Sequence, residues 1–153
     1  LSLVDWPGRF QIVPGQPTLV LDVAHNPHSV AALTVNLDAM GYFPTTHAVV
    51  GAMADKDLDA MLSRVAPLID RWYFTDLPTA RAATAADLAQ RLQRVNQGKG
   101  TVAGAFATPQ QALDAAVMAA DPTDRIVVFG SFYTEGGVLT NGTPRLSSKH
   151  SVP

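Results

Sequence analysis

The sequence contains no cysteine, few charged residues and no long hydrophobic run. The absence of cysteine from its 153 residues excludes disulfides, thiolate catalysis and zinc–sulfur sites. Charged residues make up 16% of the chain and the formal net charge is −2, which argues against a nucleic-acid-binding surface or a polybasic membrane contact. No apolar run approaches the length of a membrane span, and no basic-then-apolar leader opens the chain. We therefore expect a cytoplasmic protein with no nucleic-acid or membrane partner.

Two glycine motifs that bind nucleotides are also missing from this chain. It has no G-x-G-x-x-G, and Gly98-Lys99-Gly100-Thr101 lacks the earlier glycine of a phosphate loop and follows a helical pattern instead of a strand. Without cysteine, His25 and His28 are too few to indicate a metal site held by the protein alone. A magnesium ion brought by nucleotide phosphates is compatible with these absences.

What the sequence does contain is enough apolar residues for one domain and a regular alternation of strand and helix patterns. Its 47% hydrophobic content argues against long disorder, and its length fits a single core. The predicted strands are Thr18–Val23, Thr46–Gly51, Arg71–Thr75, Thr101–Ala105 and Arg125–Gly130. The predicted helices are residues 27–41, Leu58–Pro67, Thr84–Gln97, Pro109–Ala120 and Ser131–Leu139. The predicted helix caps are Asn26 for the first helix, Asp55 or Asp57 for the second, and Thr84 for the third.

The connections between these segments predict the sheet. Strands that alternate with helices pair in parallel through right-handed crossovers. The segment Arg9–Val13 reaches the strand Thr18–Val23 through a short link rich in proline and glycine, so we expect it to pair antiparallel at one edge. The sequence therefore predicts an α/β, Rossmann-like three-layer domain. Its sheet is mostly parallel, with about six strands and one antiparallel edge strand.

The first strand–helix junction is a candidate binding site, because open α/β sheets bind ligands beyond the carboxyl ends of their strands. Asp22 falls at the end of an apolar strand, and His25 and Asn26 stand in the turn before the helix. An aspartate there can accept hydrogen bonds from the two hydroxyls of a nucleotide ribose, and the helix amino terminus favours anions. The structural alternative is that Asp22 binds loop amides and His25 packs in the turn. Spacing alone supports both interpretations equally.

Three other residues are candidates, each with a simple structural alternative. Lys56 stands at a helix start, where a cation is unfavourable, so it suggests a carboxylate or phosphate opposite it; a solvated helix start is the simpler explanation of Lys56 alone. Ser131 places a hydroxyl at the mouth of the crevice or only caps a helix. A lone arginine on an edge strand usually serves only solubility, and Arg9 would contact phosphate or base only if that strand borders the crevice.

Four ordered segments resemble one known family. They are P-G-R-F-Q, L-D-V-A-H-N-P-H-S-V-A-A-L, V-V-G-A-M-A-D-K-D-L-D-A-M-L and V-V-F-G-S-F-Y-T. Together they resemble the carboxy-terminal domain of bacterial dihydrofolate synthase/folylpolyglutamate synthase, in the Mur ligase superfamily, from Trp6 to about Leu139. A-H-N-P identifies the superfamily, and D-K-D after G-A-M with G-S-F-Y narrows it to the folate branch.

The resemblance implies an ATP-dependent ligase that forms an amide. In that family a pterin or folate carboxylate is phosphorylated by ATP, and the amine of L-glutamate attacks the acyl phosphate. The implied site residues are Arg9, Asp22 and Asn26 for ATP, His25 as the catalytic residue near the nucleotide–glutamate junction, and Lys56 and Ser131 for the carboxylates of glutamate.

The same resemblance implies that part of the family's machinery lies elsewhere. The phosphate loop, the magnesium ligands and the folate pocket belong to the family's amino-terminal and central parts. We therefore expect residues 1–140 to be a Mur ligase-type carboxy-terminal domain of a larger enzyme and residues 141–153 to be a flexible tail. The expected partners are ATP with Mg²⁺, L-glutamate, dihydropteroate or folate, and the protein's own phosphate-loop domain. The isolated chain is expected to be inactive.

Two alternatives remain open from the residues. A peptidoglycan Mur ligase shares A-H-N-P but would carry an arginine-rich substrate loop, which this sequence lacks. A non-catalytic, receiver-like doubly wound binding module would need an acidic pair on its first strand and a lysine after its last, where this chain has Gly130 and Ser131.

Overall fold

The computed structural model describes residues 10–131 and Thr134. The strands, in chain order, are β1 (Gln11–Val13), β2 (Thr18–Leu21), β3 (Thr46–Val50), β4 (Arg71–Thr75), β5 (Thr101–Phe106) and β6 (Arg125–Phe129). The helices are α1 (Pro27–Ala39), α2 (Leu58–Val65), the 3-10 helix η2 (Ala66–Leu68), α3 (Ala85–Val95) and α4 (Pro109–Ala119).

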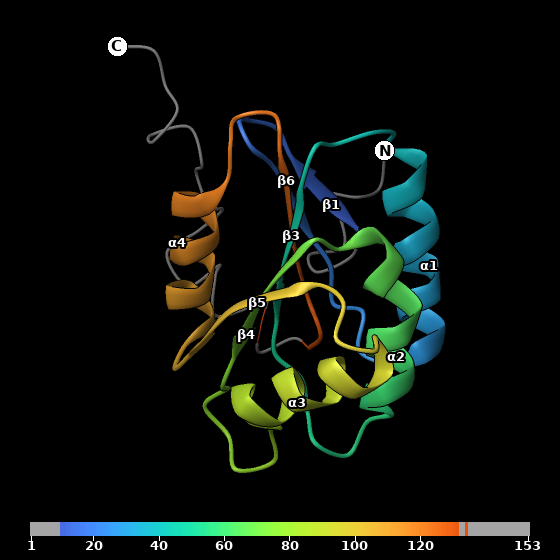
Figure 1. The fold of residues 1–153 in the computed structure, drawn as a ribbon, viewed down its shortest axis with the longest axis vertical. Helices are drawn as coiled ribbons and strands as arrows, with labels where there is room; N and C mark the ends of the chain where they lie inside the picture. Colours follow the sequence, from blue (N-terminus) through green and yellow to red (C-terminus); the bar gives the residue numbers. More distant parts are fainter. Residues whose placement is uncertain (1–9, 132–133, 135–153) are drawn as a thin grey trace.

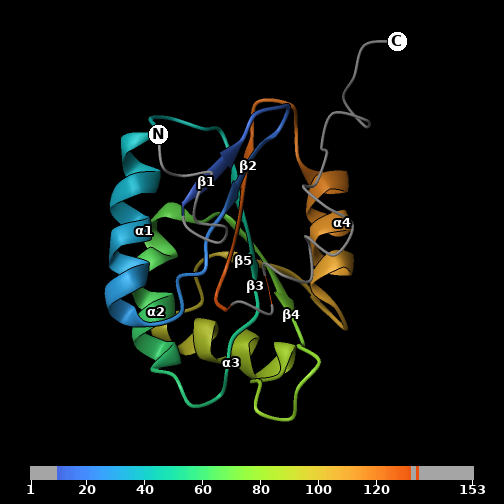
Figure 2. The ribbon, with the colours of Figure 1, turned by 180° about the vertical axis from the view of Figure 1, so that it is seen from behind.

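The strands form one sheet in the order β1-β2-β6-β3-β4-β5. All neighbouring pairs are parallel except β1 and β2, which are antiparallel and lie side by side at one edge (Figure 2). Helices α1, α2 and α3 pack on one face, and α4 packs on the other (Figure 1). The predicted three-layer fold with an antiparallel edge strand is therefore confirmed.

The helices begin where their capping residues predict. The Asn26 side chain accepts a hydrogen bond from the Ser29 backbone, and the Ser29 hydroxyl in turn accepts one from the Asn26 N–H, which makes a capping box at the start of α1. Asp57 caps α2 and Thr84 caps α3 through side-chain oxygens. Every cap lies at the carboxyl end of the sheet, so these helices all start beside the expected ligand crevice.

Several predicted boundaries were too long. The first long strand ends at Leu21, two residues before the prediction, because the Asp22 carboxylate accepts a hydrogen bond from the Ala24 N–H and turns the backbone out of the ladder. The second helix leaves α-geometry at Val65, since Pro67 has no N–H to donate. Apart from Ser131 and Thr134, the predicted last helix and the predicted tail lie outside the described residues.

A buried polar cluster lies at the amino end of the sheet. His47 Nδ1 is 2.9 Å from the Tyr73 hydroxyl, and His47 Nε2 is 3.0 Å from Asp124 Oδ2. The Asp121 N–H donates to the same carboxylate oxygen. All three side chains of this amino-end cluster (His47, Tyr73 and Asp124) are buried. Each therefore depends on the others to replace the water it has lost.

A buried arginine stands beside that cluster on the opposite face of the sheet. The Arg125 guanidinium donates to the Leu37 carbonyl at 2.7 Å and to the Thr46 hydroxyl at 3.0 and 3.1 Å, and lies 4.5 Å from the centre of the Phe43 ring. Burial lowers the pKa of Arg125. Arg125 therefore joins the end of α1 to β3 and β6, which is a structural role.

Candidate functional site

The carboxyl ends of β2, β6 and β3 lie next to one another, because these strands are parallel neighbours. The Asp22 N–H donates to the Val128 carbonyl at 3.0 Å, and the Gly130 N–H donates to the Ala24 carbonyl at 2.9 Å. These backbone bonds join the turn after β2 to the turn after β6. Residues more than one hundred positions apart in the sequence thus share one rim of the sheet.

Two glycines permit this close approach. Gly130 has a φ of +120°, and a Cβ there would collide with the carbonyl oxygen of Gly51. A Cβ at Gly51 would come within 3 Å of the side chains of Leu77, Thr75 and Thr134. Because any larger residue would push the strand ends apart, both glycines are needed to form the rim.

Asp22 presents a partly desolvated carboxyl group at this rim. Its Oδ1 accepts a hydrogen bond from the Ala24 N–H at 2.8 Å. Burial raises the pKa of Asp22 to about 6, although hydrogen bonds from the Ala24 and Val23 backbone act in the opposite direction. At neutral pH the group is mainly ionised, so it can accept hydrogen bonds but not donate them.

His25 and Asn26 follow in the same turn and have different roles in the structure. His25 Nδ1 lies 2.9 Å from the Val23 carbonyl, which can only accept, so this nitrogen carries the proton and Nε2 is the acceptor of the neutral ring. The Asn26 carboxamide oxygen is used in capping α1. The predicted cap is therefore confirmed, and a contact of Asn26 with ATP would have to involve its amide nitrogen.

A pocket of about 430 Å³ opens beside this turn. Its lining consists of the turn after β2, one face of α1 and the residue before β1, that is Phe10, Asp22, Val23, Ala24, His25, Ser29, Ala32, Leu33 and Asn36. Sequence reasoning missed Phe10, Ser29 and Asn36. The signal for the two helix residues was present, because Ser29 and Asn36 are seven positions apart and so share a face of α1.

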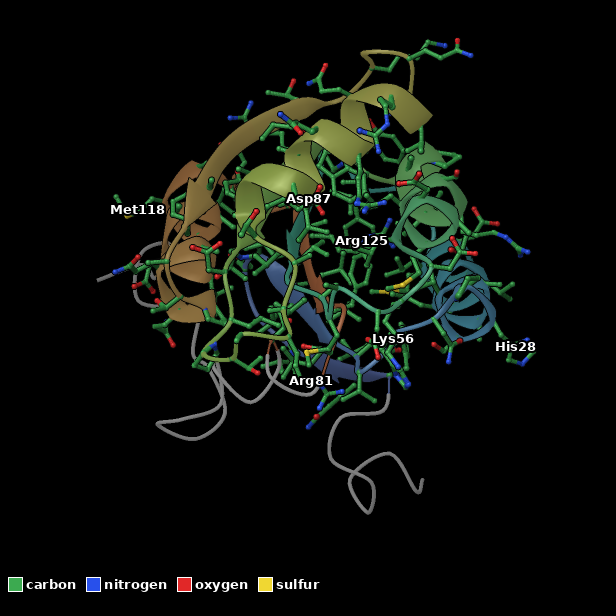
Figure 3. The ribbon with its side chains drawn as sticks, turned by 90° about the horizontal axis from the view of Figure 1, so that it is seen from below. His28, Lys56, Arg81, Asp87, Met118 and Arg125 are labelled. Carbon is green, nitrogen blue, oxygen red and sulfur yellow. The ribbon has the colours of Figure 1, made fainter. Side chains whose placement is uncertain are left out.

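Lys56 lies in the loop between β3 and α2, next to the cap of α2. The loop is held by a hydrogen bond from the Leu58 N–H to the Lys56 carbonyl at 2.9 Å. Within the described residues the Lys56 ammonium group makes no hydrogen bond or ion pair. Lys56 follows the carboxyl end of β3, and its side chain is labelled in the view from below in Figure 3. The structure thus places a lysine without an ion-pair partner, among the described residues, at the predicted edge.

Ser131 follows β6 and is buried. Its hydroxyl oxygen accepts a hydrogen bond from the Thr134 N–H at 3.1 Å and lies 3.0 Å from the Thr134 hydroxyl. The Thr134 hydroxyl donates to the Gly51 carbonyl at 2.7 Å. Ser131 therefore acts as a cap that connects the ends of β6 and β3. A hydrogen bond with glutamate would have to use the remaining lone pair of the Ser131 hydroxyl oxygen.

The structure thus brings Asp22, His25 and Ser131 to neighbouring strand ends, with Lys56 on the adjoining loop. The predicted ATP-binding residue Arg9 lies outside the described residues. Within residues 10–131 and Thr134, no group of three or more His, Asp or Glu side chains is arranged to hold a metal ion. None of the helices described is long and apolar enough to cross a membrane.

The chain is similar to several known proteins. Residues 8–132 match the family model "Mur ligase, glutamate ligase domain". The chain is 38% identical over 133 residues to dihydrofolate synthase/folylpolyglutamate synthase of Escherichia coli K12, covering 87% of this chain and 30% of that protein. It is 36% identical over 143 residues to a probable bifunctional folylpolyglutamate synthase/dihydropteroate synthase of Haloferax volcanii, covering 94% and 16%.

Solved structures show the same similarity. E. coli FolC in complex with DHPP and ADP superposes with a TM-score of 0.80 at 38% identity, covering 89% of this chain and 31% of that one. A bifunctional folylpolyglutamate synthase/dihydrofolate synthase with Mn, AMPPNP and L-glutamate bound gives 0.78 at 36% identity, with the same coverage. The chain spans about a third of the length of these relatives or less. With its fold, its rim and these matches taken together, the chain belongs to the Mur ligase, glutamate ligase domain family.

Proposed function

We propose that this chain is the ATP- and glutamate-facing domain of a longer ligase that adds L-glutamate to dihydropteroate, to folates or to both. The observation that carries the proposal is the set of neighbouring strand ends in a chain of the glutamate ligase family. These ends offer a half-buried carboxylate, a histidine and a nearby unpaired lysine. Similar solved structures hold ADP in one case and AMPPNP with L-glutamate in another, which supports the same ligands for this chain.

In the proposed reaction, ATP phosphorylates the carboxylate of the pterin substrate and leaves as ADP. The amine of glutamate then attacks the acyl phosphate, so that an amide forms and inorganic phosphate leaves. Mg²⁺ would accompany the phosphates of ATP. Its ligands are proposed to lie outside this chain, because the described residues provide no such cluster.

Each residue of the rim has a chemical task in this proposal. The ionised Asp22 accepts hydrogen bonds from the two ribose hydroxyls of ATP, and Arg9 and Asn26 contribute further ATP contacts. His25, whose Nδ1 proton is held by the Val23 carbonyl, presents Nε2 toward the junction of nucleotide and glutamate. Lys56 binds a carboxylate of glutamate, which explains a cation beside a helix amino terminus, and Ser131 contacts the same substrate.

The proposal is tested by ATP consumption in the full-length protein that carries this chain, with dihydropteroate or folate and L-glutamate supplied. Asp22→Ala should raise the KM for ATP by about tenfold or more, the loss expected for a charged hydrogen-bond acceptor. Lys56→Ala should raise the KM for glutamate by a similar factor and leave the KM for ATP within about twofold.

Two results would reject the proposal or its assignments. The function is wrong if the wild-type protein forms no ADP that depends on both glutamate and the pterin substrate. If activity is present but Lys56→Ala weakens both substrates equally, Lys56 has a structural role instead. Arg64→Ala, at the exposed far end of α2, is a matched control that removes one cation without touching the rim.

A further inference from the structure

We infer that Arg81, in the loop between β4 and α3, is a second carboxylate-binding residue beside Lys56 and contributes to selection of a dicarboxylic amino acid. The inference rests on the proposed function and adds a residue to it. The backbone of the loop that carries Arg81 is hydrogen-bonded to the loop that carries Lys56.

Two backbone hydrogen bonds join these two loops. The Ala54 N–H donates to the Arg81 carbonyl at 2.8 Å, and the Ala83 N–H donates to the Ala52 carbonyl at 2.9 Å. Together these two bonds pair Met53 with Ala82 as an isolated antiparallel bridge. The Arg81 backbone is therefore fixed against the strand end that leads to Lys56. The Arg81 guanidinium also lies 4.0 Å from the carboxylate of Asp55, the residue before Lys56, and Figure 3 labels both cations in the view from below.

The backbone of the Arg81 loop is also held by hydrogen bonds within the loop and to its neighbours. Asp76 anchors its base, since its carboxylate accepts from the Ala85 N–H at 2.7 Å and its N–H donates to the Phe106 carbonyl at 2.8 Å. The Thr79 hydroxyl accepts from the Arg81 N–H at 3.3 Å. A loop whose backbone is fixed by these hydrogen bonds positions a side chain more precisely than a mobile loop does.

The Arg81 side chain is available to a ligand. Its ion pair within the described residues is with Asp55, at 4.0 Å between Nη2 and Oδ2, and the two side chains are 75% and 63% exposed. An exposed pair at this distance contributes little stability. An incoming carboxylate can therefore replace Asp55 at small cost, and it can use two N–H groups of the planar guanidinium at once.

The local charge balance also requires a second cation. Lys56 is flanked by Asp55 and Asp57, so these three residues alone carry a net charge of −1 and would repel a carboxylate. Asp57 is partly neutralised by the amino terminus of α2, which it caps. Adding Arg81 brings the net charge of these four residues to zero. Two cations on adjoining loops then match the two carboxylates of glutamate, whereas Lys56 alone can neutralise one.

The test is steady-state kinetics of the full-length protein with Arg81→Ala, Arg81→Lys and the control Arg64→Ala. Arg81→Ala should raise the KM for L-glutamate about tenfold, with kcat and the KM for ATP within about twofold, and Arg81→Lys should recover part of the loss. The preference of the enzyme for L-glutamate over L-glutamine, which lacks the side-chain carboxylate, should shrink in Arg81→Ala. Arg64→Ala should change none of these values.

The inference is overturned if Arg81→Ala leaves the KM for glutamate within twofold, or if it raises the KM for ATP by the same factor as that for glutamate. Thermal unfolding separates a binding effect from misfolding, since an exposed side chain should be removable without loss of stability. An active wild-type enzyme with unchanged Arg81→Ala kinetics removes this inference alone, whereas an inactive wild-type enzyme removes the proposed function.

Discussion

At the amino end of the sheet, His47, Tyr73 and Asp124 bond to one another inside the core, whereas at the carboxyl end Asp22 borders a pocket and Lys56 has no partner in the described part of the chain. The same strands contribute to both ends. Paired polar groups in a dry environment are typical of structural roles. Polar groups that bear an unmet charge or a desolvation cost are typical of binding sites. The comparison thus separates residues that stabilise the fold from residues that serve a ligand.

The largest expected effect concerns a carboxyl-end position that is structural in spite of its place. Gly130→Ala should lower the free energy of unfolding by about 3 kcal/mol or more, because the new Cβ would collide with the Gly51 carbonyl at a φ that alanine rarely adopts. Urea denaturation measures the loss. Gly41→Ala is the control, since Gly41 also has a positive φ but nothing within 4 Å; about 1 kcal/mol is expected there. Equal losses would show that crowding at the rim is unimportant.

The next effect tests the amino end. Asp124→Ala should lower the free energy of unfolding by about 2–3 kcal/mol, because it leaves the buried His47 Nε2 without a partner and removes the acceptor of the Asp121 N–H. In the full-length protein the KM values for both substrates should stay unchanged. The exposed Asp114→Ala on α4 is the control and should cost less than about 0.5 kcal/mol. If Asp124→Ala has normal stability but altered KM values, the amino end is not purely structural and the proposed division between the two ends of the sheet is wrong.

The smallest effect has the opposite sign and depends on pH. Below about pH 4 the Asp22 carboxyl is protonated in both the folded and the unfolded chain, so it contributes nothing to the pH dependence of stability. Between about pH 4 and pH 6 the unfolded chain releases this proton while the folded chain retains it, so stability falls as the pH rises. Above about pH 6 the carboxyl is ionised in both states, and the full free-energy cost of burying the charged carboxylate lowers the stability of the fold.

Asp22→Asn removes that penalty and keeps the oxygen that accepts from the Ala24 N–H. The variant should therefore be more stable than wild type at pH 8 by about 1 kcal/mol, a value reduced from the full shift because the carboxyl is partly exposed. The difference should disappear near pH 4. Thermal unfolding across this pH range measures it, and a destabilised variant at pH 8 would mean that the ionised carboxylate stabilises the fold.

The fold could be predicted closely from local sequence patterns. The predicted element boundaries that were wrong have local physical causes. The order of strands and helices, the caps Asn26 and Thr84 and the antiparallel edge strand all agree with the structure. The early end of β2 was missed because a side-chain hydrogen bond of Asp22 competes with the ladder. Periodicity carries no information about that competition.

The candidate site was only partly accessible to the same reasoning. Strand ends singled out Asp22, His25, Lys56 and Ser131, because the carboxyl ends of a parallel sheet are known to face the crevice. The cap role of Ser131 depends on Thr134 and Gly51 and appears only in three dimensions. Arg81 was not singled out either, because its relation to Lys56 is made by backbone bonds between two loops, which leave no spacing pattern in the sequence.

By itself the sequence determined the elements, the layers and the family motifs, since these depend on side-chain type, spacing and capping, which are local properties. Tertiary structure decided which strand ends meet, because the insertion of β6 between β2 and β3 is a long-range pairing. It also decided which polar groups lose their water, and with that the raised pKa of Asp22. Desolvation and contact are properties of neighbours in space, so only the folded chain assigns them.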